Sequence, residues 1–96
     1  MHYLVIDAEL GTTGIRHKYE SGSVDPVEIG VSHKTIIWLN EWLAKYEKEH
    51  YLSFVNTQVI EELDKEGIAI AITIKSELLL PKIEYCSTAY LTHKLL

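Results

Sequence analysis

The stretch that decides the fold is NTQVIEELDKEGIAIAITIKSELLLP, residues 56–81. The asparagine and threonine at its start can each cap a helix, and the proline at its end terminates any element. Two interpretations fit the residues between them. In the first, Gly67 is the C-cap of a short helix, and residues 68–75 form a strand with four isoleucines on one face. In the second, one helix continues to Leu80, because apolar residues recur at helical spacing as a single stripe: Ile60, Leu63, Gly67, Ile70, Ile74 and Leu78.

The preceding segment, residues 33–50, has a clear helical period. Ser32 is a suitable N-cap, since its hydroxyl can accept a hydrogen bond from an amide of the first turn. Trp38 and Trp42 form an i, i+4 pair, and we expect them in the core rather than in a binding groove. They lie beside one apolar face, which consists of Ile36, Leu39, Leu43 and Tyr46.

Strands are predicted at both ends of the chain. Residues 3–9 are rich in Leu, Val and Ile and alternate loosely, and residues 82–87 alternate with Ile83 and Tyr85 on one side. We expect the tail to Leu96 to extend this last strand. Together with the helical segments, these elements predict a single α+β domain over residues 1–96, with the order β-α-α-β and the helices packed on one face of a small sheet.

A long segment without hydrophobic period, GTTGIRHKYESGSVDPVEIG, occupies residues 11–30. Loops of this length are usually functional or disordered. Spaced apolar residues can attach this one to a core, so we expect an ordered and exposed binding loop. Tyrosine, arginine and carboxylates occur together in it, a combination more typical of protein recognition than of catalysis.

Composition and charge narrow the function. The net charge is −5, with five acids against two bases in residues 1–31 and seven against four in residues 32–66. A negative field repels nucleic acid and favours basic partners. One cysteine excludes an internal disulfide framework, and the N-terminus lacks the pattern of a secretory signal. We therefore expect a cytoplasmic protein that does not enter a membrane.

The first candidate for a catalytic pattern is Asp7-x-Glu9. The string LVIDAELGTTG resembles the first motif of DEDD-type exonucleases, in which an Asp-x-Glu strand binds two metal ions. Two-metal sites need several carboxylates from separate elements, and beyond residue 25 the only aspartate is Asp64, among helix acids that we expect to face water. Cys86 and His93 are a possible thiol–imidazole pair, but no third group orients them in the sequence. No cofactor or metal is expected.

A family resemblance covers residues 3–86. The succession GTTGIRHKYESGSVDP, IGVS opening a helix, WLAKYE, EGIAIAITIKSEL and KIEY resembles a group of small bacterial proteins. Their outline is a strand, a glycine-rich loop, two helices and a final strand, which implies the helical interpretation of residues 68–75. Some small acidic proteins of this kind are immunity proteins, encoded beside the secreted nuclease toxins of contact-dependent bacterial competition.

The sequence and this resemblance lead to one functional hypothesis. The chain is expected to be a non-enzymatic immunity protein, a monomer or a 1:1 complex with its toxin, that occludes the active site or substrate groove of a basic nuclease. Tyr19 would be an aromatic anchor, and Arg16 would order the loop or contact the toxin. The carboxylates expected to pair with toxin lysines and arginines are Asp7, Glu9, Glu20, Asp25 and Glu28.

Two alternatives belong to other classes. One is a small metal-dependent nuclease that uses Asp7 and Glu9. The other is a homodimeric structural or regulatory subunit that uses the Trp38/Trp42 face or an exposed sheet edge.

Overall fold

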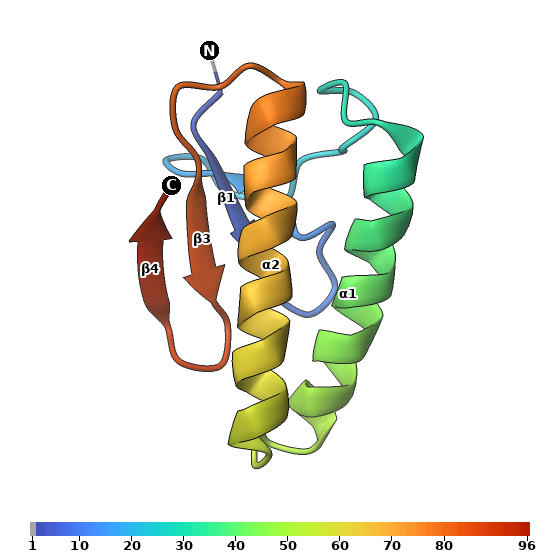
Figure 1. The fold of residues 1–96 in the computed structure, drawn as a ribbon, viewed down its shortest axis with the longest axis vertical. Helices are drawn as coiled ribbons and strands as arrows, with labels where there is room; N and C mark the ends of the chain where they lie inside the picture. The colour runs from blue at the N-terminus through green and yellow to red at the C-terminus, as the bar shows by residue number, and fades with distance from the viewer. Residues whose placement is uncertain (1) are drawn as a thin grey trace.

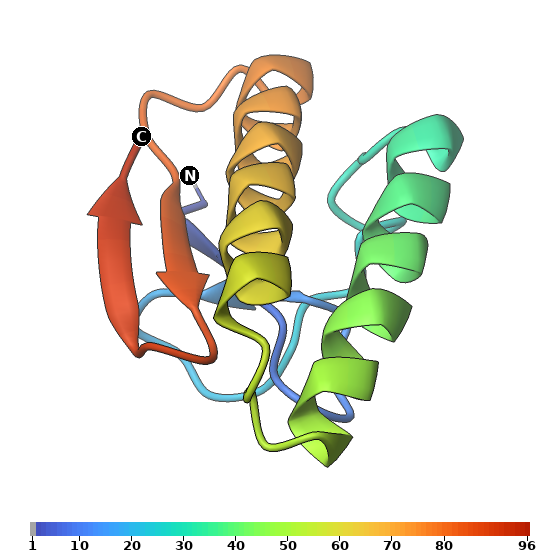
Figure 2. The same ribbon diagram turned by 60° about the horizontal axis from the view of Figure 1, so that its bottom comes forward.

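Two long helices lie on one face of a four-stranded mixed sheet in the computed structural model, which describes residues 2–96 (Figure 1). Helix α2 packs directly on β1 and β3, and α1 packs beside α2 on the side away from β4 (Figure 2). The predicted α+β class is therefore confirmed. The elements in chain order are β1 (Leu4–Asp7), β2 (Ile15–His17), α1 (His33–Tyr51), α2 (Thr57–Glu77), β3 (Glu84–Ser87) and β4 (Thr92–Leu95).

The sheet has the strand order β2-β1-β3-β4. Its central pair, β1 and β3, is parallel, and both helices lie in the crossover between these strands. The outer strands β2 and β4 are antiparallel to their neighbours. The predicted order β-α-α-β therefore omits two strands.

Both missing strands are short edge strands without a pattern of their own. β2 lies inside the segment expected to have no regular structure, where its three residues pair with β1. The tail does not extend β3; it turns at residues 88–91 and returns as β4, whose four residues are all exposed. Such strands form because a neighbouring strand offers free backbone N–H and C=O groups. The local sequence carries no signal of that neighbour.

Residues 57–77 form one helix, so the helical interpretation of the central stretch is correct. The helix ends three residues before Leu80, with Leu78 as its C-cap and Leu79 at a φ of 53°. Gly67 is not a cap but lies buried in the middle of α2, where the helix approaches Tyr85 and Trp42 closely. The residue that one interpretation made the end of the helix thus lets the helix pack against the sheet.

Helix α1 begins as predicted. The Ser32 hydroxyl accepts a hydrogen bond from the Thr35 amide, as an N-cap does. Its ends are also tied to other elements: Glu77 of α2 accepts from the Ser32 amide at 2.8 Å, and His50 meets the Ala8 carbonyl oxygen at 3.1 Å. Helix α1 therefore packs partly on the loop after β1 rather than on strands.

The core lies between the helices and the sheet. Leu4 and Ile6 of β1 face the helices, together with Tyr85 of β3. Trp42 is fully buried, and its indole N–H donates to the Leu63 carbonyl oxygen at 2.8 Å, as expected for a core tryptophan. Among the residues described, neither helix has an apolar stretch long enough to cross a bilayer.

The acids of α2 do not all face water as expected. Asp64 turns toward the sheet, where its carboxylate accepts hydrogen bonds from Tyr46 at 2.8 Å, Tyr85 at 2.6 Å and Ser87 at 2.8 Å. Glu66 accepts from Trp38 at 2.8 Å. Buried hydroxyl and indole groups need such acceptors, and the helical period alone does not reveal a carboxylate placed among them.

Candidate functional site

The face of the sheet opposite the helices is polar. Side chains alternate across a strand, so Val5 and Asp7 of β1 share this face with Arg16 of β2, their neighbour in the pairing. The Arg16 guanidinium donates to Asp7 Oδ2 at 3.4 Å, and the Thr88 hydroxyl donates to the other Asp7 oxygen. Asp7 is only 7% exposed. This carboxylate, which we expected to pair with a basic partner, therefore already has two partners inside the protein.

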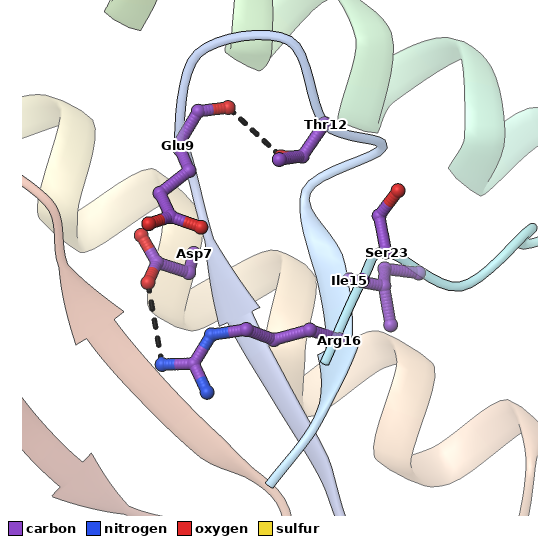
Figure 3. A pocket seen from close by; sticks show the side chains of 7 residues that line it. Asp7, Glu9, Thr12, Ile15, Arg16 and Ser23 are labelled. Atoms are coloured by element: carbon purple, nitrogen blue, oxygen red, sulfur yellow. Dashed lines mark hydrogen bonds and ion pairs between the residues drawn. The ribbon is translucent and has the colours of Figure 1, made fainter. Parts of the chain in front are cut away.

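Asp7, Glu9 and Arg16 nevertheless meet, as Figure 3 shows. They line a hollow of about 80 Å³ at the end of β1, closed on its other sides by the turn at Thr12 and the returning loop at Ser23. The carboxylates of Asp7 and Glu9 lie on the same side of the chain, as their i, i+2 spacing predicts. Glu9 is exposed. The hollow is large enough for a few water molecules or one small cationic group.

The metal-nuclease alternative gains no support from this geometry. In residues 2–96, no three side chains among His, Cys, Asp and Glu lie close enough to hold a metal ion together. The Asp7 carboxylate is also held by Arg16 and Thr88. Two-metal hydrolysis needs several free carboxylates around one point.

The third group that the sequence did not provide for Cys86 and His93 is Glu84. The Cys86 sulfur lies 3.6 Å from His93 Nε2, and His93 Nδ1 lies 3.2 Å from Glu84 Oε1. Only the β3–β4 pairing brings these residues together. The thiol, however, is 4% exposed, and burial together with the neighbouring Asp7 carboxylate raises the pKa of Cys86 to about 11. A buried, protonated thiol is a poor nucleophile.

Tyr19 and Glu20 lie elsewhere, in a shallow recess beyond the end of β2. The Tyr19 ring is 82% exposed and meets the Tyr3 ring edge-on, with 5.8 Å between centroids. Lys82 Nζ lies 4.5 Å from the centroid of the same Tyr3 ring. Tyr19 is thus supported from behind while its outer face stays free, as an aromatic anchor requires.

Asp25 and Glu28 lie in the turns that lead into α1, and both are exposed. The Asp25 carboxylate accepts a hydrogen bond from the Val27 amide at 2.9 Å, and the Val31 amide donates to the Pro26 carbonyl oxygen at 3.0 Å. Pro26 itself is buried and attaches the turn to the protein. Between the two acids, the Val27 side chain is 69% exposed.

The loop that carries these residues is held by backbone contacts. The Lys18 amide donates to the Tyr3 carbonyl oxygen, and the Val24 amide donates to that of Ile15, each at 2.8 Å. Arg16 and Ser23 form a further β-bridge. The segment is therefore folded back along β2, and its backbone is hydrogen-bonded on both sides of residues 19–22.

The residues expected to bind a partner thus fall into three places: the hollow at the end of β1, the recess at Tyr19 and the turns before α1. Sequence reasoning missed Thr88, Glu84 and Asp64, because their partners lie on other elements. Comparison of this chain with models of protein families, with curated proteins and with solved structures found no match.

Proposed function

We propose that this chain is a non-enzymatic inhibitor of a basic protein, an immunity protein that neutralises a bacterial nuclease toxin. The observation that carries the proposal is the loop between β2 and α1, which exposes Tyr19 and Val27 together with the carboxylates of Glu20, Asp25 and Glu28. A fixed loop loses little conformational entropy on binding, so its contacts contribute more fully to affinity.

The proposed mechanism is occlusion. A nuclease must present a basic cleft to the phosphates of its substrate. An acidic loop with an exposed aromatic side chain can enter such a cleft. Opposite charges steer the encounter, and the bound loop then excludes nucleic acid from the cleft. Tyr19 supplies the apolar contact at the centre, and the carboxylates pair with lysines and arginines around it.

The geometry changes the expected role of Asp7 and favours one of the two roles expected for Arg16. The ion pair between Asp7 and Arg16 joins β1 to β2, and Arg16 also forms the β-bridge with Ser23, so both residues position the loop rather than contact the toxin. Glu9 is exposed at the edge of the hollow and can accept a toxin ammonium group there. The contact residues of the proposal are therefore Glu9, Tyr19, Glu20, Asp25 and Glu28.

The test begins with capture of the partner on the tagged chain, followed by association kinetics with the purified partner at several salt concentrations. A double charge reversal in the loop, Glu20→Lys with Asp25→Lys, should slow association and weaken inhibition of the nuclease. The matched control is Glu47→Lys with Glu61→Lys, two exposed helix acids that change the net charge equally.

Each result has a clear meaning. Slower association of the loop variant but not of the control supports the loop as the interface. Equal slowing of both would show that only net charge acts, which contradicts the proposed interface. Association that does not depend on salt would contradict electrostatic steering, and a captured partner without a basic surface would contradict the proposed function.

A further inference from the structure

A second surface feature lies on the helices, away from the loop residues discussed above. The C-terminal half of α1 and the N-terminal half of α2 enclose a groove of about 440 Å³. This volume is within the range of grooves that hold small ligands or side chains. Its lining combines an apolar part, Val59 and Leu63, with charged residues of both helices.

Glu49 is the unusual residue of this groove. It lines the groove and is only 6% exposed, and its Oε1 atom is buried and accepts no hydrogen bond. Within residues 2–96 it takes part in no ion pair. Nearly all buried polar atoms of folded proteins have a partner, because an unpaired one costs free energy. A buried carboxylate oxygen without a partner inside the protein is therefore available to accept a hydrogen bond from a ligand or a water molecule.

The other charges of the groove do not satisfy Glu49. Lys45 donates to Glu66 Oε1 at 2.7 Å, and Trp38 donates to Glu66 Oε2 at 2.8 Å, so that lysine is already paired. Lys48 and Glu62 also line the groove and are exposed. Glu49 is thus the buried acceptor of the groove, with Glu62 as a second acid at its exposed edge.

We propose that the α1–α2 groove is a binding site for a guanidinium group, with Glu49 as its carboxylate. A guanidinium presents parallel N–H donors that match both oxygens of a carboxylate, and it is less strongly hydrated than an ammonium group. The methylene stem attached to it can lie on Val59 and Leu63. The proposal does not depend on the proposed function, since free arginine-like molecules and arginine side chains of a protein share this chemistry.

The test is an NMR titration of the isotopically labelled chain with Nα-acetyl-arginine amide. The control ligand is the citrulline derivative, which has the same shape but no charge. We expect saturable shifts of the Val59 and Leu63 amides with the arginine derivative only. Glu49→Gln should weaken this binding at least about tenfold, whereas Glu61→Gln, on the exposed surface of α2, should leave it within about twofold.

Two results would overturn the proposal: equal shifts with the citrulline derivative, or unchanged binding by a folded Glu49→Gln variant. The ligand comparison uses the unaltered chain, so it decides the question even if that variant does not fold. A glycine-flanked arginine peptide distinguishes the source. Equal or tighter binding of the peptide indicates an arginine in a protein, and weaker binding indicates a free small molecule. Because no toxin is used, failure here leaves the proposed function untouched.

Discussion

Replacing Gly67 with alanine should lower the free energy of unfolding by about 2 kcal/mol, although alanine is the better helix former. Gly67 is buried in the middle of α2, facing Tyr85 and Trp42. A Cβ atom there would overlap Cε1 of Tyr85 and lie only 2.7 Å from Cζ2 of Trp42. The structure has no room for it unless a ring or the helix moves.

The magnitude follows from two opposing effects. Alanine stabilises a helix interior by about 1 kcal/mol relative to glycine. Overpacking a well-filled core costs about 1–3 kcal/mol, and the upper end applies here because both rings are fixed. The Tyr85 hydroxyl is bonded to Asp64 at 2.6 Å, and the Trp42 indole is bonded to the Leu63 carbonyl oxygen at 2.8 Å. Overpacking therefore outweighs helix propensity.

The assay is urea unfolding followed by tryptophan fluorescence, with the free energy taken from the midpoint and slope. The control is Asn40→Ala, an exposed position in the middle of α1, where the better helix former should leave stability equal or up to about 0.5 kcal/mol higher. A Gly67→Ala variant as stable as the unaltered chain, or more stable, would refute the argument that close packing selects glycine here.

Three further predictions concern polar groups that are hydrogen-bonded between elements. Asp64→Ala leaves three donors without their acceptor and should cost about 3 kcal/mol in urea unfolding, while Glu61→Ala should change stability by less than about 0.5 kcal/mol; equal effects would contradict the network. Burial raises the pKa of Tyr46 from 10.0 to about 12, and burial with the Asp64 hydrogen bond raises that of Tyr85. The stabilisation from these two neutral tyrosines is present below pH 10 and is lost as the pH rises toward 12. Phenolate absorbance should therefore show two tyrosines that ionise only at higher pH, together with unfolding. Ionisation of all six tyrosines near pH 10 would contradict this prediction. Burial opposes ionisation of Glu77, but hydrogen bonds from Thr35 and Ser32 outweigh it and lower the pKa. This stabilisation is present above pH 4.5 and is lost as the pH falls through the folded-state pKa of Glu77. The Glu77→Gln variant should therefore lose less stability than the unaltered chain when the pH is lowered, as measured by urea unfolding at several pH values. An equal loss in both proteins would show that other groups cause the acid dependence.

For much of the candidate site, the sequence predicted which residues take part but not which of them lie together. The i, i+2 spacing correctly placed Asp7 and Glu9 on one side of the chain. It did not reveal that Thr88, 81 residues away, donates a hydrogen bond to the Asp7 carboxylate. Nor did it reveal that β4 brings His93 between Cys86 and Glu84. These contacts depend on strand pairing, which has no local signature in short edge strands.

Local sequence signals specified α1 and the first half of α2, whereas residues 68–75 fitted either a helix or a strand. The apolar period of the helices and the N-cap at Ser32 are local signals, since a helix satisfies its hydrogen bonds within its own residues. The tertiary structure alone decided what the helices pack on: β2 within the long loop, the return of the tail as β4, the inward turn of Asp64 and the need for glycine at position 67. Each of these depends on a partner distant in the chain, because a strand or a buried polar group is stabilised by what lies across from it.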